Sequence, residues 1–170
     1  NADLLGLALY AFDGTGTDEE SYTHVRMLFD SHYKEKKEYE RGIGSHFYSK
    51  ILGGITGFGG GLKLESMYRK LVKNYKSGDK EIDIIGFSRG AALSREFANM
   101  IFERGIAEFR TSYVSISEGP NEWKREVHKM IECKPSIRFV GLFDTVGSFG
   151  IPGNYIDIGI RMDLPENVKI

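Results

Sequence analysis

The sequence predicts an α/β fold in which a mostly parallel, twisted sheet is flanked by helices. Two observations support this prediction. Three apolar runs have the length and composition of strands buried on both faces, and segments with a helical spacing of apolar residues lie between them. Strands of a covered parallel sheet are continuous apolar runs, whereas half-exposed strands alternate. Strands that alternate with helices along a chain predict a parallel sheet covered by helices.

The first half of the chain contains two strands and two helices in this interpretation. The run at 4–12 predicts a buried strand that ends at Asp13-Gly14. Apolar residues at helical spacing predict a helix over 21–33, and a weaker pattern predicts a second strand over 36–43. The glycine-rich stretch 51–62 is unsuited to regular structure. A helix over 64–75 follows it, closed by Ser77-Gly78.

The second half repeats the alternation. We expect a buried strand at 81–87, a helix at 89–104 that Gly105 ends, and a buried strand at 136–143. Residues 106–118 show no clear period. Gly119-Pro120 is typical of a helix start, which predicts a helix through Ile131. No repeat or linker divides the chain, and its 170 residues correspond to about one domain, so we expect a single α/β domain over 1–170.

Composition excludes several classes of protein. A hydrophobic fraction of 41% can form a core, which argues against a disordered chain. The net charge of −1 lacks the basic excess typical of nucleic-acid binding. No apolar run reaches the roughly 18 residues of a membrane span, and Asp3 stands where a signal peptide is positively charged, which predicts a protein that is cytoplasmic as synthesised. The single cysteine, Cys133, excludes an internal disulfide, and we expect it to be a buried, inert thiol.

A candidate nucleophile follows the strand at 81–87. The residues Gly86-Phe87-Ser88-Arg89-Gly90 fit G-x-S-x-G, and the strand before them and the helix after them match the setting of a nucleophile elbow. Gly86 and Gly90 lack a Cβ, so the strand and the helix can approach each other closely. The backbone N–H of Arg89 lies at a helix N-terminus, where it can stabilise an oxyanion. The alternative is that Ser88 serves only as a helix N-cap.

A candidate acid follows the strand at 136–143. Asp144 can hold an imidazole in the correct tautomer and stabilise its charged form. The alternative is that Asp144 only caps the turn after the strand. Asp157 and Asp163 are the reserve candidates, although neither follows so clear a strand.

A catalytic triad of serine, acid and histidine would complete this site, but its histidine is not evident in these residues. In α/β-hydrolases the order is serine, acid, then histidine, but all four histidines precede Asp144. We expect the base beyond Ile170, in a domain that is incomplete at its C-terminus. His46, near the glycine-rich stretch, is the in-chain substitute to test, and the other histidines are expected to be solvated, namely His24, His32 and His128.

The loop after the first strand is a candidate second source of oxyanion donors. Such a donor usually comes from an early strand–helix loop, which points to the N–H groups of Gly14 or Thr15, with Asp13 shaping the site. A plain Asx turn is the alternative. A dehalogenase-type phosphatase motif would place its nucleophile where Ala11 stands, so that hypothesis fails. The glycines at 53–61 predict either a flap over the site or a surface crossing.

Several of these segments together resemble a bacterial α/β-hydrolase family that includes type VI secretion lipase effectors. The residues that carry the resemblance are Phe12-Asp13-Gly14-Thr15-Gly16, Gly86-Phe87-Ser88-Arg89-Gly90-Ala91 and Phe143-Asp144-Thr145-Val146-Gly147-Ser148-Phe149-Gly150. The resemblance implies a phospholipase with a Ser-Asp-His triad, in which Ser88 is the nucleophile and Asp144 the acid. It also implies export as an effector, transient contact with a membrane surface, and an immunity or secretion-apparatus protein as partner.

Three hypotheses about function follow from the sequence. The first is a serine esterase or lipase that acts on a lipid or small ester through an acyl-enzyme and needs no cofactor or metal. The second is a hydrolase-fold module without catalytic activity, which binds a ligand or a protein. The third is a metal-assisted phosphohydrolase that uses Asp13 and Asp144, which both follow strands.

Overall fold

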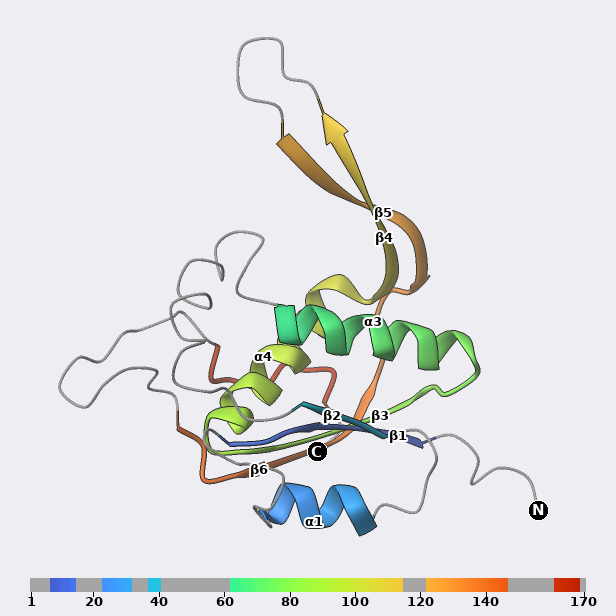
Figure 1. Cartoon of the computed structure of the whole chain (residues 1–170). Helices are drawn as coiled ribbons and strands as arrows, with labels where there is room; N and C mark the ends of the chain where they lie inside the picture. Colours follow the sequence, from blue (N-terminus) through green and yellow to red (C-terminus); the bar gives the residue numbers. More distant parts are fainter. Residues whose placement is uncertain are drawn as a thin grey trace, which may run out of the picture.

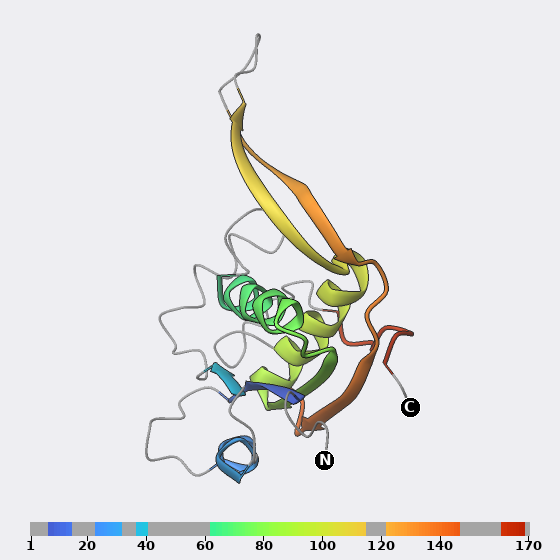
Figure 2. The same cartoon turned by 90° about the vertical axis from the view of Figure 1, so that its right-hand side faces the viewer.

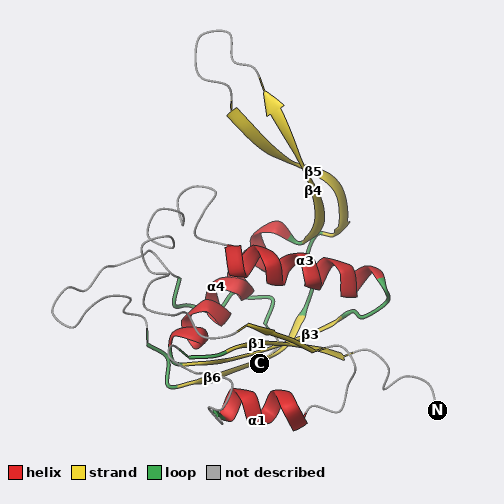
Figure 3. Cartoon of the chain, viewed as in Figure 1, coloured by secondary structure: helices red, strands yellow, loops and turns green. Residues whose placement is uncertain are grey.

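A four-stranded parallel sheet forms the centre of the molecule in the computed structural model, which describes residues 7–14, 23–31, 37–40, 62–114, 122–146 and 161–168. Its order is β2-β1-β3-β6 (Figures 1 and 3). The strands are β1 (Leu7–Phe12), β2 (Lys37–Glu40), β3 (Glu81–Phe87) and β6 (Ile137–Phe143). All the pairings are parallel, so the ends of the strands meet at one side of the sheet, which we call the carboxyl edge.

Helices lie on both faces of this sheet, as the sequence predicts. The buried strand expected at 136–143 is wrong in one respect, because β6 is exposed at Arg138, Phe139 and Phe143. Helix α1 (His24–Ser31) lies on one face, and α3 (Leu62–Lys76) and α4 (Arg89–Arg104) lie on the other (Figure 2). On the α1 face, Val25 and Phe29 pack against apolar side chains of β1 and β3. The mostly parallel sheet flanked by helices confirms the predicted α/β fold class.

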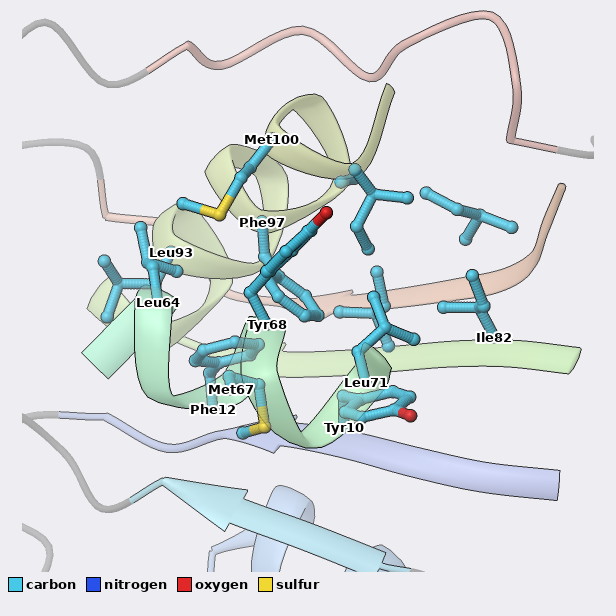
Figure 4. Close-up of a cluster of buried hydrophobic side chains, with 14 of the residues drawn as sticks. Tyr10, Phe12, Leu64, Met67, Tyr68, Leu71, Ile82, Leu93, Phe97 and Met100 are labelled. Carbon is cyan, nitrogen blue, oxygen red and sulfur yellow. The ribbon is translucent and has the colours of Figure 1, made fainter. Parts of the chain in front are cut away.

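The larger core lies between the sheet and the helices α3 and α4. Phe97 of α4 packs against two aromatic side chains of β1, with ring centroids 5.9 Å from Tyr10 and 5.3 Å from Phe12 (Figure 4). Burying one such side chain stabilises the fold by about 1.5–3 kcal/mol. The strand β1 is buried along its described side chains because both of its faces are covered, and it forms a rigid support for the loop that follows it.

The segment between α4 and β6 differs from the prediction. The helix expected over 120–131 is wrong, because β5 (Glu122–Glu132) pairs as an antiparallel strand with β4 (Ile106–Val114). This hairpin projects away from the sheet (Figures 1 and 2). It leaves α4 at the end opposite Ser88, so it lies far from the carboxyl edge. Hydrogen bonding to β4, which is distant in sequence from much of β5, outweighs the local helix signal of Pro120.

The base of the hairpin also corrects the expectation for Cys133. Gly105 leads into β4 with a φ of 62°, and a Cβ there would collide with the carbonyl oxygen of Glu132 and lie 2.9 Å from that of Cys133. The chain therefore enters and leaves the hairpin at adjacent points. Cys133 lies in the bend after β5 and is exposed, so the buried thiol is wrong.

The last described segment, 161–168, packs along α4 and then returns to the sheet. Arg161 forms an ion pair with Glu96 at 2.7 Å, and Asn99 donates a hydrogen bond to the carbonyl oxygen of Asp163 at 2.8 Å. Val168 then forms a parallel bridge with Ile137 at the start of β6. This single bridge places Val168 beside β6, with the chain running in the same direction as the four strands.

Candidate active site

Ser88 occupies a sharp turn between β3 and α4. Its backbone has a φ of 55° and a ψ of −120°, which is a strained conformation for a residue other than glycine. Ser88 stands at the N-cap position of α4, but its side chain makes no capping hydrogen bond. The alternative hypothesis was that the Ser88 hydroxyl serves only to cap the helix, and the hydroxyl does not cap α4 in the structure.

Two glycines allow the strand and the helix to meet at this turn. A Cβ at Gly86 would lie 2.5 Å from the carbonyl oxygen of Gly90 and 2.7 Å from the Cα of Ala91. A Cβ at Gly90 would lie 2.6 Å from the carbonyl oxygen of Asp13. Real Cβ atoms do not approach other atoms so closely. The turn is thus packed against both α4 and the end of β1.

A buried serine that sequence analysis did not identify holds the first turn of α4 to β3. The hydroxyl of Ser94 lies 2.9 Å from the carbonyl oxygen of Gly90 and 3.2 Å from that of Ile85. Its side chain is fully buried. A small polar residue one turn into the helix after the motif was the only signal available for it.

Asp144 follows the strand next to Ser88 in the sheet. Phe87 pairs with Phe143, so Ser88 and Asp144 are the residues immediately after two paired positions. Adjacent strands lie about 4.8 Å apart, which places the two backbones side by side. Asp144 is exposed and has a φ of 47°. Its carboxylate can therefore reach a group that approaches from outside the sheet.

Of the two reserve acids, Asp163 is described by the structure and is not at this position. The carbonyl oxygen of Asp163 accepts its hydrogen bond from Asn99, in the third turn of α4 from the carboxyl edge. Asp157 lies outside the described residues. Among the described candidates, Asp144 is the acid that the fold brings next to Ser88.

The loop after β1 lies against Ser88. A Cβ added to Gly14 would be 3.4 Å from the Cβ of Ser88 and 2.8 Å from the ring of Phe87. The backbone N–H of Gly14 donates a hydrogen bond of 2.7 Å to Oδ1 of Asp13. A role for this N–H as an oxyanion donor stays a prediction, and the Asp13 carboxylate is its competing acceptor. Thr15 lies outside the described residues.

Asp13 is buried, with 2% of its surface exposed, and is held by three donors. Besides the N–H of Gly14, its Oδ2 accepts hydrogen bonds from the hydroxyls of Thr23 at 2.7 Å and Tyr39 at 2.6 Å. Burial, together with the hydrogen bond to Asp13, raises the pKa of Tyr39 above its ordinary value. Sequence analysis missed Tyr39 and Thr23, because neither is close to Asp13 along the chain.

The described histidines are His24 and His128, and they occupy very different places. His24 begins α1 at the carboxyl edge, and its ring stacks on that of Phe143 with centroids 6.2 Å apart. His128 is exposed on β5 of the distant hairpin. Both are exposed, as expected for solvated histidines, but the position of His24 beside the site was not predicted. His32 and His46 lie outside the described residues.

The geometry gives little support to the phosphohydrolase hypothesis. Both oxygens of Asp13 already accept hydrogen bonds from protein donors. Within the described ranges, no three His, Cys, Asp or Glu side chains come together in a way that could hold a metal ion.

No described helix is long and apolar enough to cross a membrane.

Comparison with known proteins identifies the family. Residues 9–162 match the family model described as "T6SS, Phospholipase effector Tle1-like, catalytic domain". Neither a curated protein nor a solved structure gives a match. The matched region contains the elbow at Ser88, the loop at Asp13 and the turn at Asp144, and nearly all of the chain lies within it. The chain therefore belongs to the Tle1-like phospholipase effector family of type VI secretion systems, and its residues 9–162 match the catalytic domain of that family.

Proposed function

We propose that this domain is a serine hydrolase that cleaves carboxylic esters of phospholipids through an acyl-enzyme on Ser88. The main support is the strained turn at Ser88, which ends a buried parallel strand and leaves the hydroxyl unused for helix capping. Strain of this kind persists only where the surrounding structure imposes it, and it concentrates at functional sites. Membership of a phospholipase effector family supports a lipid ester as the substrate.

The reaction begins when Oγ of Ser88 attacks the ester carbonyl carbon. A base takes the hydroxyl proton as the new C–O bond forms, and the tetrahedral intermediate carries its negative charge on the former carbonyl oxygen. Collapse of the intermediate expels the alcohol, which takes the proton from the base. Water then attacks the acyl-enzyme by the same steps and releases the fatty acid.

Arg89 supports the charged intermediate in this proposal. Its backbone N–H belongs to the first residue of α4, where the positive end of the helix dipole favours negative charge. Removing one oxyanion donor from a hydrolase typically costs about 10²–10³ in kcat. The Arg89 guanidinium is half-buried, and burial lowers its pKa from the ordinary value. Gly14 or Thr15 would supply the second donor.

Asp144 would orient the histidine that serves as base. We expect that histidine beyond Ile170, and the bridge between Val168 and Ile137 supports this expectation. A strand that continues from Val168 beside β6 runs toward the carboxyl edge. A residue that follows such a strand emerges beside Asp144, within reach of Ser88.

The proposal extends to partners and location. A phospholipid substrate requires contact with a membrane surface, and an effector of this family is exported by the secretion system. We also propose an immunity protein as a partner that blocks the site in the producing cell. The domain would comprise residues 1–170 and the segment that carries the base.

A fluorophosphonate probe tests the nucleophile directly, because it forms a covalent bond only with an activated serine. The full-length protein, with the segment expected to carry the base, is incubated with the probe beside Ser88→Ala and, as a matched control, Ser77→Ala. Ser77 follows α3 at the end of the sheet remote from Ser88. We expect labelling of the wild type and of Ser77→Ala on the peptide that contains Ser88, and none of Ser88→Ala.

Fatty-acid release from phosphatidylglycerol vesicles by the same three proteins tests the reaction itself. Release that survives Ser88→Ala contradicts the proposal. Absence of labelling and of release in the wild type would favour the non-catalytic binding module instead.

A further inference from the structure

We propose that Tyr39 and Thr23 are positioning residues of this site, which act through the carboxylate of Asp13 to hold Gly14 against Ser88. The inference rests on the proposed serine hydrolase function. It adds two residues from β2 and from the start of α1 that the nucleophile motif does not include.

The three hydrogen bonds of Asp13 come from three different parts of the fold. Tyr39 is on β2, Thr23 precedes α1, and Gly14 follows β1. The hydroxyl of Thr23 also accepts a hydrogen bond of 3.0 Å from the backbone N–H of Arg26, so it caps α1 at the same time. One carboxylate thus joins both neighbouring elements to the loop after β1.

The loop held in this way is in direct contact with the nucleophile turn. The Gly14 backbone packs on Phe87 and Ser88, and the carbonyl oxygens of Phe12 and Asp13 pack on Gly90. A Cβ at Gly90 would collide with backbone atoms of Phe12 and Asp13, and a Cβ at Gly14 would collide with the ring of Phe87, so the loop and the turn are in direct contact. A displacement of Asp13 is therefore transmitted to the atoms around the Ser88 hydroxyl.

Burying the Asp13 carboxylate costs folding free energy. This cost argues that the carboxylate has a role in the active site. A buried carboxylate loses its hydration, and neutral donors compensate for that loss only when all of them are well placed. An apolar side chain could fill the same space without this cost. The three hydrogen bonds are short, with donor–acceptor distances of 2.6–2.7 Å, as expected for hydrogen bonds to a carboxylate.

The Tyr39 side chain is itself fixed in place. Its ring packs against Phe29 of α1 with centroids 5.1 Å apart, and the Arg26 guanidinium lies 5.2 Å from its centroid. Burial and the hydrogen bond to Asp13 raise the pKa of Tyr39, so the hydroxyl remains a donor throughout the neutral range. The ring contacts would persist in phenylalanine, so Tyr39→Phe keeps the ring and removes the hydroxyl with its hydrogen bond to Asp13 and its interaction with Arg26.

The test compares Tyr39→Phe with Tyr75→Phe, using p-nitrophenyl butyrate hydrolysis and the rate of fluorophosphonate labelling. Tyr75 is a buried tyrosine of α3 whose ring contacts Lys80, far from Ser88. For Tyr39→Phe we expect kcat and the labelling rate to fall about tenfold or more, with KM changed less than twofold, because misplacement affects the transition state most. For Tyr75→Phe both should equal the wild type.

A second pair of variants tests the Thr23 hydroxyl by removal and rescue. Thr23→Val removes the hydroxyl with little change of shape, and Thr23→Ser restores it. We expect Thr23→Val to lower kcat as Tyr39→Phe does, and Thr23→Ser to recover it to within threefold. Activity of Thr23→Val and Tyr39→Phe equal to wild type overturns the proposal, as does an equal loss in Thr23→Ser.

These outcomes remain distinct from failure of the proposed function. If the wild type is not labelled at Ser88, the serine hydrolase proposal fails and the positioning proposal falls with it. If the wild type is labelled and Tyr39→Phe is labelled at the same rate, only the positioning proposal is wrong.

Discussion

Ser88 is hydrogen-bonded on both sides to the segment that carries Asp144. The N–H of Ser88 donates to the carbonyl oxygen of Phe143 at 2.8 Å, and the carbonyl oxygen of Ser88 accepts from the N–H of Val146 at 3.1 Å. Asp144 lies between these two partners. These two hydrogen bonds therefore hold the backbone of Ser88 at a fixed distance from the backbone of Asp144.

This arrangement predicts the effect of replacing the acid. Asp144→Asn keeps the size of the side chain but favours the wrong tautomer of a partner histidine, so we expect kcat to fall about 10³–10⁴-fold. Asp163→Asn is the matched control, because that residue lies beside α4. Hydrolysis of a short-chain ester by the two variants measures the difference. Full activity of Asp144→Asn would remove this residue from the proposed triad.

The conformation of Ser88 predicts a reversal of the usual order of stability between alanine and glycine. At most positions glycine is the less stable of the two, by roughly 0.5–1 kcal/mol. At a φ of 55° only glycine escapes the strain, so we expect Ser88→Gly to unfold at higher urea concentration than Ser88→Ala. Ser66, inside α3, supplies the control pair with the normal order. The normal order at Ser88 as well would contradict the strained turn.

Much of the fold could be predicted because its strands are unambiguous. The run 81–87 is apolar apart from Glu81 and Asp83, and a parallel sheet covered on both faces is the structure that buries such a run. The glycine pattern around Ser88 could likewise be predicted, since its residues are adjacent in sequence. In both cases the signal and the structure are local.

The parts that were missed depend on contacts between distant residues. Apolar positions in β5, such as Val127 and Ile131, fit a helix as well as a strand, and only pairing with β4 decides between them. Tyr39 lies 26 residues from Asp13, and no spacing rule connects them. A parallel β1–β2 pairing would have been needed first, because it places Tyr39 opposite Ala11, two residues before Asp13.

The close approach of α4 to β1 predicts that even a methyl side chain at position 90 destabilises the fold. The Cβ of Gly90→Ala would collide with backbone oxygens of Phe12 and Asp13, which cannot move without displacing β1. We expect the free energy of unfolding to fall by about 1–3 kcal/mol. Gly141→Ala is the control, because the atoms nearest to its Cβ would belong to side chains. These are the ring of Phe139, which is 52% exposed and can rotate away, and the Cγ2 of Ile85 at 3.2 Å. Urea unfolding of both variants checks this, and equal losses would contradict it.

The attachment of the hairpin predicts a dependence of stability on pH. Glu65 of α3 accepts a hydrogen bond of 2.7 Å from Arg125 of β5 and also pairs with Arg104 of α4. Burial alone would raise the pKa of Glu65, but the hydrogen bonds from both arginines outweigh it and lower the pKa. A lowered pKa in the folded state contributes stability above the unfolded pKa of about 4.3, and that contribution is lost as the pH falls through the folded value.

Glu65→Gln should therefore lower the free energy of unfolding by about 1–3 kcal/mol at pH 7, as expected for loss of hydrogen bonds between charged groups. Urea unfolding at pH 7 and pH 3.5 should show a smaller difference from the wild type at the lower pH, because the Glu65 carboxyl group of the unfolded wild type, with a pKa of about 4.3, is then largely protonated. Glu103→Gln removes an exposed partner of Arg161 and should cost no more than about 0.5 kcal/mol. A loss for Glu65→Gln that is the same at both pH values would mean that packing of the side chain, rather than its charge, holds the hairpin to α3.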